Sequence, residues 1–228
     1  MLRRLRRAVL RLVGVFVVGS VAVVAVSRFV DPPATPLMLI RVVERWQSGQ
    51  TGRYEYAPVP LGAISEHLQR AVVAAEDTRF FVHHGIDVAA ARKAAEHNVR
   101  TQGRRLRGGS TITMQCAKNV FLWPGRTWVR KAFEAWFALL MEAIWGKRRI
   151  LDVYLNVVEW GDGVYGAEAA ARRWFGRTAR DLEPREAALL AAVLPNPRRW
   201  SAAEPSSYVQ ARAAIIERRA AAVRIDGR

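Results

Sequence analysis

The chain carries near its N-terminus an apolar run that can cross a lipid bilayer. No charged residue lies between Leu12 and Ser27, and Arg28 ends the run. Its 16 residues are slightly fewer than the ~20 that a spanning helix needs. The arginines at both ends can extend toward the polar surface, and the two apolar residues after Arg28 lengthen the segment. We therefore predict a transmembrane anchor over residues 12–30.

The arginines before this run predict its orientation. There are five of them: Arg3, Arg4, Arg6, Arg7 and Arg11. Basic residues are retained on the cytoplasmic side of a membrane, so residues 1–11 are expected in the cytoplasm and the body of the chain outside it. A cleaved signal peptide is the alternative, because Ala25, Val26 and Ser27 resemble a cleavage site. The run is longer than the usual ~7–15 residue apolar core of a signal peptide, which favours a retained anchor.

The rest of the chain is also strongly basic. The whole chain has a formal net charge of +16, and +11 remains without the five N-terminal arginines. This charge indicates an anionic partner: nucleic acid, anionic lipid or a substrate phosphate. The single cysteine, Cys116, excludes an intramolecular disulfide and the paired cysteines of zinc sites. We expect it to be a buried, unreactive thiol.

The 228 residues suffice for one soluble domain besides the anchor. Prolines break any helix after Asp31, so residues 31–58 are interpreted as a connector and membrane-proximal segment, and residues 59–228 as the domain. Strand-like alternation is limited to one short hairpin near residues 54–59. The spacing of apolar residues predicts helices at residues 64–76, 126–145, 148–156, 167–174 and 186–193. The sequence therefore predicts a mainly α-helical fold.

Glu76 and Asp77 stand at the end of one of these predicted helices. Acidic groups there oppose the helix dipole, which indicates function rather than stabilisation. A carboxylate beside apolar residues can have its pKa tuned for general-base catalysis, although a solvated helix end gives the same pattern. His83 and His84 follow, and without a clear third ligand a structural role is favoured over metal binding.

A second group of polar residues follows a basic, glycine-bearing loop over residues 103–109. The group is Ser110, Thr111, Thr113, Gln115, Lys118 and Asn119. Ser110 is the expected N-cap of the next helix. Glycines admit close backbone approach, and hydroxyls, N-terminal amides and a lysine together suit a phosphate. A capped helix after a tight turn explains the pattern equally well, and the Gly-Lys-Ser/Thr of a Walker loop is absent.

A third group recurs at intervals of four residues. Arg126, Arg130 and Glu134 therefore share one helix face, with Lys131 beside them. Surface ion pairing explains such a cluster. The cluster also suits a diphosphate held beside a second carboxylate.

Five motifs, in this order, resemble glycosyltransferase family 51. They are Glu-Asp-x-x-Phe at 76–80, Gly-Gly-Ser-Thr-Ile-Thr-Met-Gln at 108–115, Lys-Asn at 118–119, Arg-Lys-x-x-Glu at 130–134 and Ile-Leu-Asp-x-Tyr-Leu-Asn at 150–156. The resemblance covers most of the outer domain and implies a lysozyme-like, two-lobed, mainly helical fold. The short chain, the single anchor and the absence of the Ser-x-x-Lys of a penicillin-binding module make it similar to the monofunctional members.

The resemblance also implies a reaction and residue roles. Family members transfer a growing glycan strand on undecaprenyl diphosphate to the 4-hydroxyl of lipid II, with inversion to a β-1,4 link and release of undecaprenyl diphosphate. Glu76 matches the general base, and Glu134 matches a second essential carboxylate near the diphosphate. The positions that match diphosphate-binding residues are Lys118, Arg126, Arg130, Ser110, Thr111, Thr113 and Gln115. The supporting positions are Asp77, Lys131 and Asn119.

The same resemblance implies partners and a location. No protein-held metal is implied, and a divalent cation, Mg²⁺ or Mn²⁺, at the diphosphate is the one cofactor left open. The partners are lipid II, the growing glycan strand and the cytoplasmic membrane, with other cell-wall synthesis proteins left open and no nucleic acid. The location is the bacterial inner membrane, with a single span and the catalytic domain in the periplasm.

Two positions depart from the family pattern, and a third residue is added to the acidic candidates. Asp152 replaces the usual Glu and is expected to keep a structural contact. Cys116 stands where an apolar residue is usual. Glu159 lies in a turn where many relatives lack a carboxylate, and it ranks third among the acidic candidates.

Two other functions remain as alternatives. A lysozyme-like hydrolase or lytic transglycosylase also places a glutamate in a helical cleft, but it needs no diphosphate site. The Lys118, Arg126 and Arg130 cluster argues against it. A basic, membrane-tethered wall or nucleic-acid binder would explain the charge but would leave the ordered motifs accidental.

Overall fold

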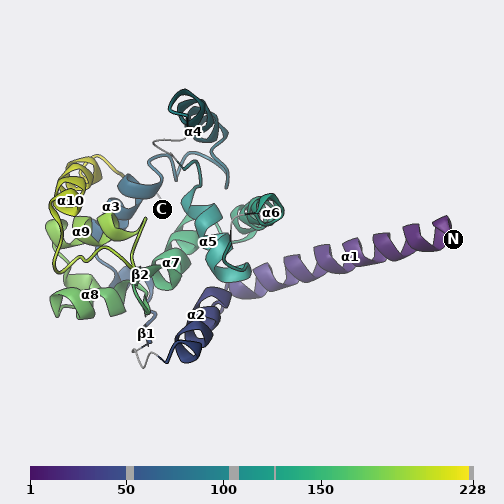
Figure 1. Ribbon diagram of the computed structural model, residues 1–228, viewed down its shortest axis with the longest axis horizontal. Coiled ribbons are helices and arrows are strands. Elements are labelled where there is room, and N and C mark those ends of the chain that lie inside the picture. The colour runs from purple at the N-terminus through teal and green to yellow at the C-terminus, as the bar shows by residue number, and fades with distance from the viewer. Residues whose placement is uncertain (50–53, 103–107, 126, 226–228) are drawn as a thin grey trace.

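The structure is a computed structural model that describes residues 1–49, 54–102, 108–125 and 127–225. These residues form ten α-helices and three short strands (Figure 1). The helices are α1 Leu2–Ser27, α2 Pro36–Gln47, α3 Glu66–Glu76, α4 Val88–Arg100, α5 Ile112–Phe121, α6 Trp128–Ile144, α7 Lys147–Val157, α8 Ala167–Phe175, α9 Pro184–Val193 and α10 Ser207–Ala220. The strands are β1 Glu55–Tyr56, β2 Glu159–Gly161 and β3 Val164–Tyr165. The prediction of a mainly helical fold is confirmed.

α1 is one continuous helix that begins inside the basic segment and ends where the apolar run ends. Its 26 residues span about 39 Å, which exceeds the ~30 Å hydrocarbon core of a bilayer. In the described part of the chain it is the one helix long and apolar enough to cross a membrane. Its N-terminal part extends away from the body of the molecule (Figure 1).

The C-terminal half of α1 packs on α6. Trp136 Nε1 donates to Ser20 Oγ over 3.1 Å, and Trp145 Nε1 donates to the Val24 carbonyl over 2.6 Å. The Phe16 and Phe133 rings meet edge to face, with centroids 5.4 Å apart. α1 is therefore attached to α6 over about two helical turns, from Phe16 to Val24.

The connector contains a helix that the sequence analysis missed. Thr35 caps α2 by accepting a hydrogen bond from Met38 N over 3.3 Å, and Pro36 occupies the first helical position. Proline is well suited to that position, because its missing N–H would have no partner there anyway. Pro36, which was expected to break a helix, therefore starts one, and that expectation is wrong.

Two further local predictions are wrong. Residues 54–59 form no hairpin, because β1 pairs in parallel with β3, with Glu55 opposite Val164. Alternation in a sequence predicts a strand but does not identify its partner. Ser110 is not the N-cap of α5, since Thr111 Oγ1 accepts from Met114 N over 3.1 Å and the helix begins one residue later than expected.

The core joins two groups of helices. α3 packs against α9 and α10, while α5 packs against α6 and α7. Asn156 of α7 ties this second group to the segment before α3, because its side chain donates to the Val59 carbonyl and accepts from Val59 N. Cys116 lies fully buried in this core, as predicted, and burial raises the pKa of its thiol.

Candidate functional site

Glu76 is the last residue of α3, and it lies where three helices meet. Gln115 of α5 donates from Nε2 to Glu76 Oε2 over 2.9 Å, and Arg212 Nη2 of α10 lies 3.8 Å from Glu76 Oε1. Burial raises the pKa of Glu76, while the Gln115 hydrogen bond and the Arg212 charge oppose that rise. A partly buried carboxylate with a raised pKa has the properties that a general base requires near neutral pH.

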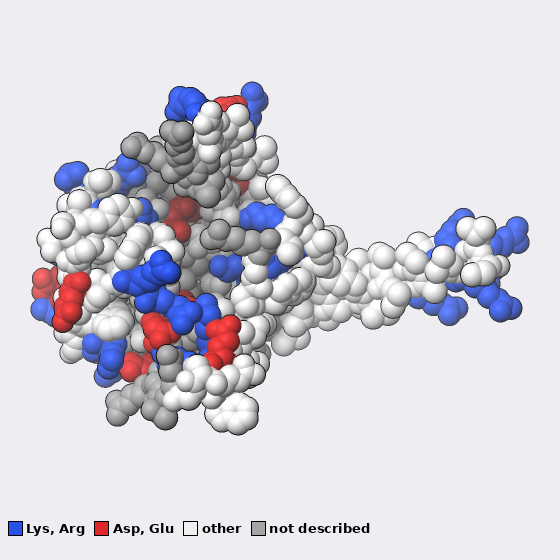
Figure 2. Space-filling view, viewed as in Figure 1, with Lys and Arg blue, Asp and Glu red and all other residues white. Residues whose placement is uncertain are grey.

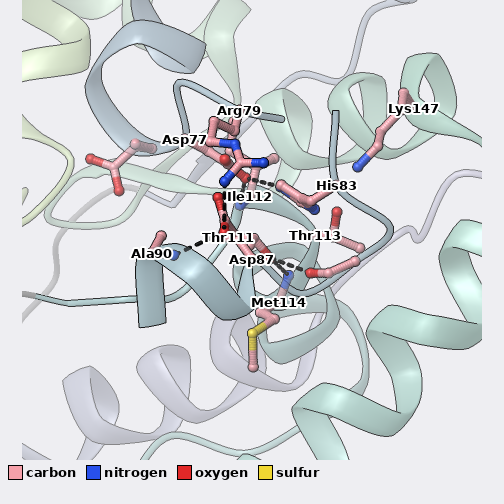
Figure 3. Close-up of polar contacts among 12 residues, drawn as sticks. Asp77, Arg79, His83, Asp87, Ala90, Thr111, Ile112, Thr113, Met114 and Lys147 are labelled. Carbon is pink, nitrogen blue, oxygen red and sulfur yellow. Dashed lines mark hydrogen bonds and ion pairs between the residues drawn. The ribbon is translucent and has the colours of Figure 1, made fainter. Parts of the chain in front are cut away.

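Asp77 holds the loop after α3 against the start of α5 (Figure 3). Its Oδ2 accepts from Ile112 N over 3.0 Å and pairs with His83 Nε2 over 2.8 Å. His83 is buried in this contact, which agrees with the structural role favoured from the sequence. Within the described ranges, no group of three His, Cys, Asp or Glu side chains could hold a metal ion.

The two threonines of the second motif are buried (Figure 3). Thr111 donates to the Gly85 carbonyl over 2.5 Å, and Thr113 donates to Glu142 Oε1 over 2.7 Å. Lys147 Nζ donates to the same Glu142 oxygen over 2.6 Å. Thr113 is fully buried and lines neither of the pockets described below.

A pocket of about 320 Å³ brings together residues from the second and third motifs and from α2. Its polar lining includes Gln115, Lys118, Asn119, Arg130, Arg41 and Glu159. Burial lowers the pKa of Lys118, and the Glu134 charge opposes this change. The predicted Arg126 lies outside the described residues. Lys118, Arg130 and Arg41 thus line this pocket with positive charge that suits an oxyanion.

Glu134 is buried behind this pocket and does not line it. It forms ion pairs with Arg130 and, over 2.8 Å, with Lys131 Nζ, which also donates to Ser110 Oγ over 2.7 Å. Glu134 is 3% exposed and Arg130 is 7% exposed, so the pair is largely shielded from water. Glu134 therefore contacts two cationic side chains, those of Arg130 and Lys131.

A second pocket, of about 260 Å³, lies on the other side of Glu76. Its lining includes Glu76, Asp77, Arg79, Lys93 of α4, and residues 108–111. Gly109 contacts α4 closely, since a Cβ there would lie 2.8 Å from Ala91 Cα. Packing on α4 therefore explains why a residue without a side chain is needed at position 109.

The two pockets meet at the Gln115–Glu76 hydrogen bond, because Gln115 lines the first and Glu76 the second. Figure 2 shows lysine and arginine side chains around this hollowed face, and a separate basic group at the end of α1. A larger hollow of about 740 Å³ lies at the other end of α3, but no residue of the five motifs lines it. The candidate site is therefore the region around Glu76, where motif residues line both smaller pockets.

Residues of this region that were not singled out from the sequence include Arg41 and Arg212, and Tyr154 stood in the fifth motif without an assigned role. Arg41 lies on the missed helix α2, and Arg212 lies on α10, which also was not predicted. The signal for α10 was present, because Ser206 caps the helix by accepting from Val209 N. The contact between Arg212 and Glu76 joins distant parts of the sequence, so no local pattern indicates it.

The structure also shows where Asp152 and Glu159 lie. Asp152 Oδ2 accepts from Arg149 Nη1 over 3.0 Å, which confirms the expected structural contact. The expectation that Glu159 lies in a turn is wrong, because it lies buried on strand β2, where it lines the first pocket, and burial raises the pKa of its carboxyl.

Comparisons with known proteins extend over nearly the whole chain. A family model described as Transglycosylase matches residues 44–221. A biosynthetic peptidoglycan transglycosylase of Rhodospirillum centenum is 57% identical over 99% of this chain and 94% of its own length. Proteins with the same name from Caulobacter vibrioides and Ectopseudomonas mendocina are 49% and 51% identical, over 99% and 95% of this chain and 95% and 88% of their own lengths.

Proposed function

The chain belongs to the transglycosylase family, and we propose that it polymerises peptidoglycan glycan strands from lipid II. Its activity is that of a peptidoglycan transglycosylase. The proposal adds that the growing strand, carried on undecaprenyl diphosphate, is transferred to the 4-hydroxyl of lipid II. The observation that supports it most directly is the hydrogen bond between Glu76, which lines the second pocket, and Gln115, which lines the cationic pocket.

In this mechanism Glu76 is the general base. It takes the proton of the acceptor 4-hydroxyl as the hydroxyl oxygen bonds to the anomeric carbon of the donor sugar. The bond from that carbon to the diphosphate oxygen breaks, and its electron pair leaves with undecaprenyl diphosphate. Attack opposite the leaving group inverts the anomeric centre and gives a β-1,4 link. The raised pKa of Glu76 suits this proton transfer near neutral pH.

The cationic pocket would stabilise the departing diphosphate. Lys118 and Arg130 supply positive charge in a partly buried pocket, where it acts more strongly than in water. Arg126 is added to this set by the family resemblance alone. Glu134 would act through Arg130 and Lys131, which it holds by ion pairs.

The other predicted residues would support this arrangement. Ser110 positions Lys131, and Asp77 and Thr111 fix the start of α5. Thr113 would act from within the core through Glu142, and Asn119 lines the cationic pocket. A Mg²⁺ or Mn²⁺ ion, if the reaction uses one, would be bound mainly by the diphosphate. Among the described residues that line this pocket, Glu159 is the one carboxylate.

The proposed location is the bacterial inner membrane, with α1 as a single span and the domain in the periplasm. The five N-terminal arginines support this orientation. α2 would lie on the membrane surface, because it exposes one apolar face formed by Leu39, Val42, Val43 and Trp46. This placement would bring the cationic pocket close to the lipid headgroups.

Polymerisation of labelled lipid II by the wild type and by Glu76→Gln tests the proposal. Products are separated on a gel before and after muramidase digestion. The expected result is a muramidase-sensitive ladder from the wild type and at least a hundredfold less product from the variant, given the ~10²–10⁴-fold contribution of a general base. Shortening of preformed glycan by a wild type that makes no polymer would replace the proposal with a hydrolase.

A further inference from the structure

Three residues from three helices form a hydrogen-bonded chain that ends on Glu76. Tyr154 of α7 donates from its hydroxyl to Gln115 Oε1 over 3.0 Å, and Gln115 Nε2 donates to Glu76 Oε2 over 2.9 Å. Tyr154 is fully buried, whereas Glu76 lines the second pocket. The chain thus runs from the core to the site of the proposed reaction.

The Tyr154 hydroxyl determines which end of the Gln115 amide faces Glu76. A phenol donates one hydrogen bond, and among the described residues its acceptor is Gln115 Oε1. With its oxygen held there, the amide presents its N–H groups to Glu76. An N–H donor favours an ionised carboxylate over a protonated one, because the carboxylate accepts more strongly.

The reversed amide would favour the opposite protonation state. Its oxygen would face Glu76 and accept from a protonated carboxyl, while its nitrogen would face the phenol oxygen. The buried Tyr154 hydroxyl would then lose Gln115 Oε1 as its acceptor. A buried donor without an acceptor lowers the stability of the folded protein. The phenol therefore opposes the arrangement in which Glu76 is protonated.

We propose that Tyr154 is a positioning residue that orients the Gln115 amide so that its N–H donates to the Glu76 carboxylate. The inference rests on the proposed function, in which ionised Glu76 accepts the proton of the acceptor hydroxyl. Tyr154 itself does not touch the substrate pockets. It acts through Gln115, so that burial of Glu76 does not leave it in the protonated, inactive form.

Other charged groups also face Glu76 and set the reference for the effect. They are Arg212 from α10, Lys118 from α5 and Asp77 next to it in the chain. The two cations favour the ionised form, and Asp77 opposes it. A change at Tyr154 leaves these three groups in place, so it isolates the contribution of the amide.

The pH dependence of the polymerisation rate tests the inference. Activity that requires ionised Glu76 falls as the pH is lowered through its pKa. Tyr154→Phe releases the amide, so the midpoint of this acidic limb should move up by about one pH unit, which corresponds to a tenfold change in protonation equilibrium. The rate on the high-pH plateau should change much less. An unshifted midpoint in a folded Tyr154→Phe protein overturns the inference.

A double-variant comparison tests whether Tyr154 acts through Gln115. In a Gln115→Leu background, Tyr154→Phe should cause no further shift of the midpoint, because the connecting amide is absent. An equal shift in both backgrounds would mean that the phenol acts by another route, and the inference would be wrong.

Tyr56→Phe provides the matched control, since it removes one phenol hydroxyl that donates to the Pro32 carbonyl, far along the chain from Gln115. It should leave the midpoint unchanged, and a shift equal to that of Tyr154→Phe would also overturn the inference.

If Tyr154→Phe fails to fold, as judged by circular dichroism, 3-fluorotyrosine at position 154 keeps the hydroxyl and makes it a stronger donor. The midpoint should then move to lower pH, and an unchanged or higher midpoint refutes the inference. Full activity of Glu76→Gln would instead refute the proposed function.

Discussion

Replacing Glu134 by Gln should separate the structural and functional consequences of the buried cationic cluster. The change removes the negative charge that Arg130 and Lys131 share. Breaking a buried ion pair costs about 3–5 kcal/mol. The lower end applies, because Lys131 is 38% exposed and its pair is screened by water. Glutamine also keeps the volume and can accept one hydrogen bond.

A loss of about 3 kcal/mol corresponds to a fall of about 6–12 °C in the Tm of a domain of this size. The measurement is thermal unfolding of the full chain in detergent, followed by circular dichroism. Lipid II polymerisation, measured well below the new Tm, should fall about a hundredfold, because loss of one positioned group that stabilises anionic charge has an effect of this order. An unchanged Tm would refute the account of Glu134 as the partner of a buried arginine and a partly exposed lysine.

Two further variants sharpen the comparison. Replacing Arg130 and Glu134 together by Met should recover most of the stability, since no charge is left buried without a partner, while polymerisation stays low. Glu168→Gln is the matched control, because Glu168 is also buried and paired, with Arg172, but lies outside both pockets. It should lower the Tm without lowering the activity of the folded protein. Normal activity in the double variant would show that Arg130 does not serve the diphosphate.

Two remaining predictions concern stability. Glu76→Gln should raise the Tm at pH 7 and leave it nearly unchanged at pH 4. The folded pKa of Glu76 is raised, so its favourable contribution is complete below the unfolded pKa and is lost as the pH rises through the folded value. An equal Tm for both proteins at pH 7 would contradict this sign. Gly161→Ala should cost about 1–3 kcal/mol, because its Cβ would lie 2.5 Å from Trp174 Cζ2, whereas Gly62→Ala meets no atom within 4 Å and should have little effect on thermal unfolding.

Helices with a wide apolar face were predictable from the sequence, and those with a thin one were not. α7 buries seven of its residues, including Ile150 and Leu155, and its position was predicted to within one residue. α4 buries Ala94 alone among its described side chains, so its apolar pattern is weak. α10 buries Val209, Ala213 and Ile216. Their spacing is helical, but the surrounding alanines and arginines obscure it.

The site shows a similar division. The motifs predicted acidic and cationic side chains because the proposed reaction on a diphosphate would require those residue types. They did not determine which side chains touch. Gln115 was grouped with the diphosphate ligands, yet its amide also bonds Glu76. Arg212 reaches Glu76 from a helix near the C-terminus. Such contacts depend on how α3, α5 and α10 pack, which no spacing within one segment reveals.

α6 connects the membrane anchor with the cationic cluster. One side of this helix, through Phe133 and Trp136, packs on α1. Arg130 and Glu134 lie elsewhere on its circumference, and Arg130 lines the cationic pocket. A diphosphate attached to a lipid can reach a protein only near the membrane surface, so the height of this pocket above the bilayer matters for function. Because α1 packs on the helix that carries the cluster, a membrane-spanning α1 would set that height under the proposed function. Under the proposed function, α1 would then help to place the substrate-binding site as well as tether the domain.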